Sequence, residues 1–395
     1  MMPLYKAVAH GCRAGQPQEV FGEVYEARVL RGNEHFSWKK LGSFGADLAA
    51  ISNFFERPWD RPSGNITEAR QAFVLSQAGL YLRALGRLSE AAEPMRAGLE
   101  AGIDQGDWTE AAIRAGNLSE LHLTLGGLPQ AVSFARQSVE LADRTGDAFQ
   151  SMYNRAALAD ALHQSGALTE AGILFRQAEL MQKRRQPQYP LLYSVQGFRY
   201  CNLLLGGCEG VAWPSAGPQP ESALGRDQAV ARCRKVRERA GQTLEWAELA
   251  GQDLLSAALD HLTLGRTLLL EAVLGGLTPA LSDEADGHLD RAVTGLRESG
   301  NQDEIPRGLI TRSQLRRVQR RFPDARQDLD EAVQIASRGP MPFHQADIFL
   351  ERARLQHAQG NPEQARDFLS QARSLIEKLG YHRRDLEVKA LEERL

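Results

Sequence analysis

Apolar residues recur along this chain at the spacing of amphipathic helices, and the same order of residues returns at a fixed interval. In each copy a glycine is followed two residues later by leucine and five residues later by alanine. The glycines are Gly86, Gly126 and Gly166, so the period is 40 residues. The segments that share this order are 85–100, 125–140 and 165–180. Self-similarity of this kind is typical of helical hairpins that stack into an array.

The small residues of the repeat indicate how neighbouring helices pack. Ala91, Ala131 and Ala171 fall where two helices are expected to cross, and a larger side chain there would push them apart. Alanines at the same spacing return near the end of the chain, namely Ala285, Ala325 and Ala365. The sequence therefore predicts an all-α fold, a right-handed α-solenoid of about seven to eight antiparallel hairpins with a period of about 40 residues.

The 40-residue frame holds in some parts of the chain and slips in others, which gives the expected domain organisation. Glycine, proline and serine concentrate in 208–225, which we interpret as an exposed loop inserted into one hairpin. The expected parts are a degenerate N-terminal hairpin with a capping helix (1–66), regular repeats (67–206), irregular repeats that contain the insertion (207–284), regular repeats (285–379) and a C-terminal capping helix (380–395).

Composition and charge indicate a folded protein with no general attraction to polyanions. Of the 395 residues, 25% are charged and 43% are apolar, and the net charge is −3. Such a balance favours neither nucleic acid nor an acidic membrane surface. No secretory signal and no membrane-spanning apolar stretch is visible, and the four cysteines are widely spaced. We expect a cytoplasmic protein that binds no nucleic acid and no membrane; its oligomeric state stays open.

Motifs for catalysis or metal binding are missing from the sequence. HExxH, GxSxG, CxxC and EF-hand loops do not occur, and no two of the nine histidines are four residues apart. A histidine without a partner group in a motif is more often a surface or hydrogen-bonded core residue than a catalytic one. We therefore expect no enzymatic activity, no catalytic residue, no metal and no cofactor.

Arginines crowd two helices, and they allow two interpretations. One run lies in 226–239 and the other in 307–321. A basic groove for an acidic peptide is one interpretation, and it is favoured over nucleic acid because no aromatic residues alternate with the arginines. The other is a solvated face whose arginines pair with carboxylates of neighbouring repeats, and the sequence favours it. Candidate carboxylates are Asp303, Glu304, Asp324 and Asp328.

Partner-binding residues are expected on the first helix of each hairpin, because solenoids of this type bind along their concave face. Tyrosine and arginine are frequent in binding hot spots. The candidates are Tyr153, Asp160, His163, Tyr193, Gln196, Tyr200, Arg307, Gln314, Arg317, Asp347, Arg354 and His357. The tyrosines at 193 and 200 could instead be packing residues. Trp213, which lies in the insertion, is a further candidate, as a binding anchor or as a cover for the widened hairpin.

The repeat resembles the tetratricopeptide (TPR) hairpin. The matching residues are Gly166, Leu168, Ala171, Phe175 and Ala178, and near the end Gly360, Pro362, Ala365, Leu369 and Ala372. Longer blocks, such as LYKAVAHGCRAG and KLGSFGADLAAISNFFERPW, resemble the TPR region that follows the ATPase module in bacterial STAND-type signalling NTPases. The resemblance spans nearly the whole chain and implies a role in sensing a partner or restraining the NTPase. No GxxxxGK[ST] motif occurs, so ATP binding is not carried over.

These observations give three functional hypotheses. The first is a non-enzymatic protein-interaction scaffold, the sensor or regulatory array of a STAND-type system. The second is a TPR adaptor that binds an acidic peptide in an arginine-lined concave groove. The third is a small-molecule sensor or an unrecognised enzyme with a pocket near 208–225, where Trp213 and Trp246 are the supporting residues.

Overall fold

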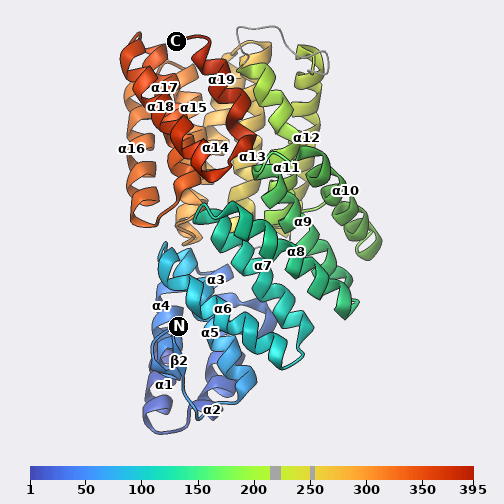
Figure 1. Ribbon diagram of the computed structural model, residues 1–395, viewed down its shortest axis with the longest axis vertical. Helices are drawn as coiled ribbons and strands as arrows, with labels where there is room; N and C mark the ends of the chain where they lie inside the picture. Colours follow the sequence, from blue (N-terminus) through green and yellow to red (C-terminus); the bar gives the residue numbers. More distant parts are fainter. Residues whose placement is uncertain (214–223, 250–253) are drawn as a thin grey trace.

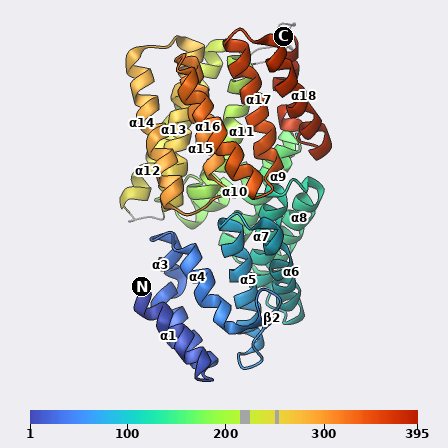
Figure 2. The ribbon, with the colours of Figure 1, turned by 90° about the vertical axis from the view of Figure 1, so that its left-hand side faces the viewer.

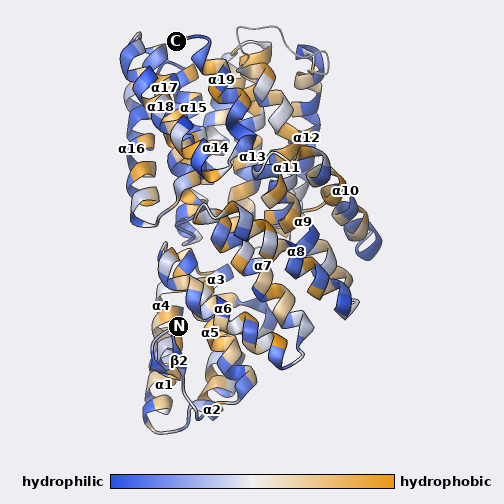
Figure 3. Ribbon diagram, in the orientation of Figure 1, coloured by the Kyte–Doolittle hydropathy of each residue, from blue (hydrophilic) through white to orange (hydrophobic). Residues whose placement is uncertain are grey.

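The predicted fold class is confirmed: the chain is an α-solenoid built from antiparallel helix pairs (Figure 1). The structure is a computed structural model that describes residues 1–213, 224–249 and 254–395. Most helices carry polar residues on one face and apolar residues on the other (Figure 3), whereas α13 (Leu254–Gly275) is buried nearly all round. No helix of the described residues is long and apolar enough to cross a membrane.

The N-terminal part is a compact group of short elements around aromatic side chains. Phe21, Tyr25 and Phe54 are buried and pack against one another, with ring centroids 5.4 to 5.9 Å apart. The Tyr25 hydroxyl lies 2.9 Å from that of Tyr81 in the first regular repeat, so this group covers the end of the array. Its elements are α1 (Met2–Arg13), α2 (Pro17–Val20), η1 (Phe21–Leu30), η2 (Gly32–Glu34), α3 (Phe36–Lys39), α4 (Phe44–Ile51), η3 (Ser52–Phe54) and the two-stranded ribbon of β1 (Phe55–Arg57) and β2 (Arg61–Pro62).

Three regular hairpins follow, and the repeated residues have the expected structural roles. The turn glycines at 86, 126 and 166 all have positive φ, which glycine adopts without strain. Ala91, Ala131 and Ala171 are fully buried where helices cross. The side chains of Asp107 and Asp147 accept backbone N–H groups and cap the helices that follow them. The hairpins are α5 (Glu68–Ala84) with α6 (Leu88–Asp104), α7 (Trp108–Thr124) with α8 (Leu128–Thr145), and α9 (Ala148–Gln164) with α10 (Leu168–Arg185).

The middle of the chain contains the longest helices. These are α11 (Ser194–Ala212), α12 (Arg226–Leu249), α13 (Leu254–Gly275) and α14 (Pro279–Glu298). The expected loop 208–225 begins too early, because α11 continues to Ala212. Buried Cys208 and Ala212 pack there against Ala229 and Cys233 of α12, which stabilises the extra turns. Residues 214–223 of the expected insertion lie outside the described residues.

The C-terminal part returns to regular hairpins and ends in a short cap. Its helices are α15 (Ile305–Val318), α16 (Phe322–Arg338), α17 (Pro342–Ala358), α18 (Pro362–Leu379), η4 (His382–Arg384) and α19 (Asp385–Glu392). Val388 and Leu391 of α19 are buried in one cluster with Leu369 and Ile376 of α18, so the terminal helix covers the apolar face of the last hairpin.

The array curls until its first half contacts its second half. Figure 2 shows α5 and α6 directly below α15 and α17. The backbone N–H of Gln302 donates to the carbonyl of Ala84 at 2.7 Å. A Cβ atom added to Gly339 would lie 2.7 Å from the carbonyl oxygen of Gly86. The turn after α5 therefore lies against the turns that precede α15 and α17.

The next two turns of the first half make equivalent contacts. An added Cβ at Gly126 would lie 2.5 Å from Pro342, and one at Gly166 would lie 2.9 Å from His382. Successive turns on one side thus meet successive turns on the other. Because the hairpins of both halves have nearly the same length, each turn of the first half meets a turn of the second half. These contacts enclose the concave face between the two halves.

Candidate partner-binding site

The concave face contains a network of paired charges. Arg83 of α5 donates to Glu120 of α7 at 2.6 Å and to Asp303 at 3.0 Å, across 220 positions of sequence. Arg199 of α11 donates to the second oxygen of Glu120 at 2.7 Å and lies 3.4 Å from Asp160. Burial alone would raise the pKa of Glu120, but the charges of Arg199 and Arg83 lower it by a larger amount, so that the pKa is about 2. Glu120 is therefore ionised and holds three helices together.

The arginines of α15 and α17 are also paired with carboxylates of the chain. Arg307 lies 2.7 Å from Glu304, and Arg317 donates to the fully buried Glu351 at 2.5 Å. On the outer side of α15, Arg312 donates to Asp328 at 2.7 Å. The interpretation of the arginine run as a paired face therefore fits the structure better than an open basic groove. Arg307 and Arg317, two of the predicted groove residues, therefore already have carboxylate partners within the protein.

Two of the predicted groove residues are packing residues instead. Tyr200 stacks on Phe175 of α10 with ring centroids 5.0 Å apart, and Arg239 of α12 lies 5.0 Å from its ring. Tyr193 packs against Trp246 at the ends of α10 and α12, with centroids 6.4 Å apart. Tyr200 thus contacts the neighbouring helices α10 and α12, and Tyr193, which directly precedes α11, contacts the end of α12.

Several other predicted residues do face the concave side but are enclosed there. Asp160 and His163 of α9 are buried, and burial together with nearby Arg383 holds the pKa of His163 well below its usual range. Gln196 is also buried, and Tyr153 is partly buried beside it. In this closed arrangement a partner cannot reach Asp160 or His163 unless the two halves separate.

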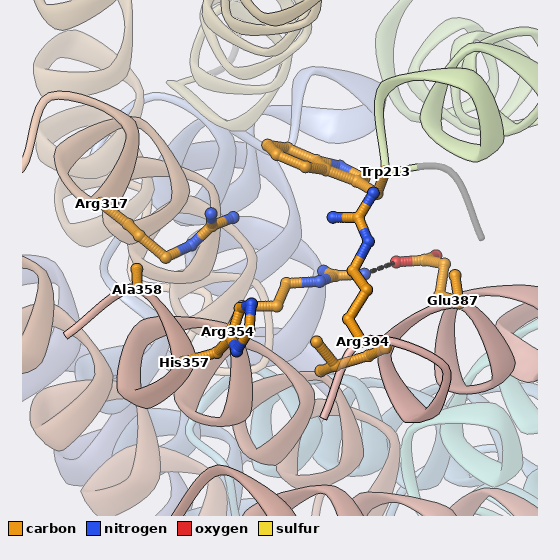
Figure 4. A pocket seen from close by; sticks show the side chains of 9 residues that line it. Trp213, Arg317, Arg354, His357, Ala358, Glu387 and Arg394 are labelled. Carbon is orange, nitrogen blue, oxygen red and sulfur yellow. Dashed lines mark hydrogen bonds and ion pairs between the residues drawn. The ribbon is translucent and has the colours of Figure 1, made fainter. Parts of the chain in front are cut away.

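The structure brings four of the predicted residues together in one pocket of about 110 Å³ (Figure 4). These are Trp213 at the end of α11, Arg317 of α15, and Arg354 and His357 of α17. We call this the Trp213 pocket. The remaining lining residues are Ala358, Glu387, Ala390, Leu391 and Arg394. The pocket therefore collects side chains from the middle, the sixth and seventh hairpins and the C-terminal cap.

Arginine side chains surround the indole of Trp213. The guanidinium carbon of Arg317 lies 4.8 Å from the ring centroid and that of Arg354 lies 5.7 Å from it, which is cation–π distance. Arg354 is held in place by Glu387 at 2.5 Å. Arg394 extends toward the indole (Figure 4). It is exposed, and no carboxylate of the described residues forms an ion pair with it.

Apart from Ala358 at the end of α17, the pocket residues that sequence reasoning missed come from the C-terminal cap. Glu387, Leu391 and Arg394 lie in a charged segment that was interpreted only as a polar cap. Ala390 and Leu391, two adjacent apolar residues in that segment, were the available signal that one of its faces is covered.

Groups that could hold a metal do not gather in the described part of the chain. No three histidine, cysteine, aspartate or glutamate side chains are arranged there as metal ligands. The four cysteines are free thiols, three of them buried. Trp213 and Trp246 do not share a pocket, since Trp246 packs against Tyr189 and Tyr193.

Comparison with known proteins gives the fold and no closer relationship. No protein-family model matches the chain, and no curated protein matches its sequence. Among solved structures, it is similar to the Rap conjugation gene regulator of plasmid pLS20 in complex with the Phr* peptide, with 13% identity and a TM-score of 0.51 over 87% of this chain and 85% of that one. A Rap protein complexed with competence and sporulation factor has 11% identity and a TM-score of 0.37 over 99% and 97% of the two chains. The first likeness shows that the chain has the fold of a helical-repeat protein.

Proposed function

We propose that this protein is a non-enzymatic protein-interaction scaffold that binds an acidic segment of a partner protein at the Trp213 pocket. The observation that carries the proposal is the exposed Arg394, which has no carboxylate partner among the described residues and lies beside an indole that two further arginines flank. Tryptophan and arginine contribute strongly to binding when a partner excludes water from them.

The composition of the Trp213 pocket indicates the chemistry of the partner. Trp213, Ala358, Ala390 and Leu391 offer apolar surface, and Arg394 offers a cation that a carboxylate can approach. A peptide with an acidic residue next to an apolar one could contact both the cation and the apolar surface. At about 110 Å³ the pocket is smaller than the several hundred Å³ usual for small-molecule sites, which argues against the small-molecule hypothesis.

Support for a peptide or protein partner also comes from the type of fold. Solenoids present extended surfaces to other proteins, and the Rap regulator that shares this fold was solved with a peptide. The identity between the two chains is too low to transfer that ligand. The proposal therefore rests on the pocket itself.

A binding experiment with an acidic–apolar probe peptide tests the proposal. Fluorescence anisotropy of a labelled peptide of alternating glutamate and leucine should report binding that weakens as salt is added. Arg394→Glu should weaken it about tenfold or more, since attraction becomes repulsion. Arg326→Glu on α16 is the matched control, because Arg326 is also exposed and lies outside the pocket. Equal affinity of Arg394→Glu and wild type would contradict the proposal.

We propose further that the array is the sensor or regulatory part of a STAND-type signalling system. This rests on the resemblance of its N-terminal blocks to the TPR regions of such proteins. Mixing the purified array with a STAND-type NTPase module and measuring ATP hydrolysis tests the idea. A change in the rate that requires the array would support it, and an unchanged rate with no complex on size-exclusion chromatography would refute it.

A further inference from the structure

A second cavity lies deeper between the two halves of the solenoid and shares no lining residue with the Trp213 pocket. We call it the inner cavity. Its volume is about 60 Å³, and its walls come from α11, α13, α15, α17 and the segment at η4. Since one water molecule needs roughly 10–15 Å³ on this measure, the inner cavity has room for several water-sized groups.

The charged groups that line the inner cavity do not balance. Four arginines face two carboxylates, and the carboxylates are Glu209 and Asp347. His344 adds no charge near neutral pH, because burial and the adjacent Arg307 lower its pKa to about 4. Glu304, which pairs with Arg307 just outside the wall, reduces the excess to one positive charge. The arginines are Arg266, Arg307, Arg383 and Arg384.

Three of the four arginines have close carboxylate partners. Arg266 donates to Glu209 at 2.9 Å, and Arg384 donates to Asp347 at 2.8 Å. Arg307 pairs with Glu304, which lies just outside the wall. Arg266 and Arg384 are held by these hydrogen bonds, whereas Arg307 has its carboxylate at ion-pair distance and its Nε makes no hydrogen bond within the described residues. The excess charge is therefore concentrated on the fourth arginine.

Arg383 is that residue. Its side chain is only 8% exposed, and its nearest carboxylate, Glu209, is 3.7 Å away and already bonded to Arg266. Among the described residues, its side chain donates one hydrogen bond, to the neutral Gln164 of α9 at 3.2 Å, and its Nε has no hydrogen-bond partner. Burial and the neighbouring Arg384 lower the pKa of Arg383, as expected for a cation whose charge is not compensated.

We infer that the inner cavity binds a small oxyanion, with inorganic phosphate preferred, through Arg383 and the arginines beside it. The planar fork of N–H donors on a guanidinium group matches two oxygens of a phosphate, and such charge-assisted bonds are strong where water is excluded. Phosphate offers oxygens both to Arg383, whose charge is uncompensated, and to the neighbouring arginines of the wall. The bound anion would contact η4 and the helices that carry Arg266 and Arg307, so it would hold the C-terminal cap against the closed solenoid.

Thermal unfolding of the full chain at constant ionic strength tests this inference. Replacing chloride by millimolar phosphate should raise the Tm of the wild type progressively, because a ligand that binds only the folded state stabilises it. Acetate should raise it less, since its two oxygens can engage one guanidinium group, whereas phosphate has further oxygens for the neighbouring arginines. Isothermal titration of phosphate should give a stoichiometry near one.

Variants distinguish the inner cavity from binding elsewhere. Arg383→Gln should lose the phosphate effect, and in chloride its Tm should equal or exceed that of the wild type, because an uncompensated buried charge is gone. Arg326→Gln, on the outer surface, should keep the full effect. Arg383→Lys keeps the positive charge but lacks the two parallel N–H donors of the guanidinium group, so the same rise in Tm should need higher phosphate concentrations.

Three results would overturn the inference. The first is no phosphate effect on the wild type, and the second is an equal effect on wild type and Arg383→Gln. The third is an equal effect of acetate and phosphate. If Arg383→Gln did not fold, the titration of the wild type with phosphate and the comparison with Arg383→Lys would still show whether phosphate binds in the inner cavity.

Discussion

Replacing Glu120 by glutamine should destabilise the protein strongly although the change in shape is small. Glu120 lies between two arginines, with Arg83 at 2.6 Å and Arg199 at 2.7 Å. All three side chains are buried to nearly nine-tenths. Glutamine offers one neutral oxygen where the carboxylate offered two charged ones. Arg199 would keep only Asp160 at 3.4 Å, and Arg83 would keep only Asp303.

Two independent routes give the size of the effect. Removing one partner of a buried ion pair costs about 3–5 kcal/mol, because the other charge stays buried. The pKa of Glu120 is lowered to about 2 from an ordinary value near 4.5, and a shift of this size corresponds to about 3 kcal/mol. Both routes therefore predict a loss of about 3 kcal/mol near neutral pH.

The pH dependence has a definite sign. The pKa of Glu120 is lower in the folded state than in the unfolded state, so its contribution is fully present above about pH 4.5 and is lost as pH falls through 2. The difference in stability between wild type and Glu120→Gln should therefore shrink below pH 4. A difference that grew on acidification would contradict the assignment of Glu120 as an ionised group.

Urea unfolding followed by circular dichroism measures the effect. Glu331→Gln is the matched control, since Glu331 pairs with Arg297 at 2.7 Å but both side chains are more than a third exposed. Exposed pairs of this kind contribute up to about 1 kcal/mol. If Glu120→Gln unfolded at the same urea concentration as Glu331→Gln, the idea that the concave network holds the solenoid together would be refuted.

Three further changes test other parts of the structure. Burial raises the pKa of Asp47 to about 6, so its ionisation costs stability as pH rises, and Asp47→Asn should stabilise the protein at pH 8 by up to about 3 kcal/mol in urea unfolding. Gly339→Val places a side chain against the carbonyl of Gly86 and should increase the radius of gyration in X-ray scattering, whereas Gly287→Val, which meets open space, should not. Tyr200→Ala removes a ring that stacks in the core, so the free energy of unfolding should fall by about 3–5 kcal/mol in urea unfolding. A loss of less than about 1 kcal/mol would contradict a core position for this ring.

The sequence predicted the hairpins well because their signals are local. Glycine at a turn, alanine at a helix crossing and the spacing of apolar residues each act within one repeat, so the positions of α5 to α10 follow from the residues alone. The expected loop 208–225 began too early for a related reason. In the sequence Cys208 and Ala212 stand next to residues typical of loops, but helix α12, which follows later in the chain, packs against them and buries them.

The concave face shows what the sequence by itself could not determine. Residue types indicated that the arginines of α15 pair with carboxylates, but no spacing indicates that Arg83 pairs with Asp303, since 220 residues separate them. That pairing depends on the small rotation between successive repeats, which accumulates over the whole array until the turn at Gly86 meets the one at Gly339. The same accumulated curvature places Trp213 beside Arg317 and Arg354, and encloses Arg383 among more cations than carboxylates. The sequence therefore determined the repeat, and only the tertiary structure decided which repeats meet and which charges remain for a partner.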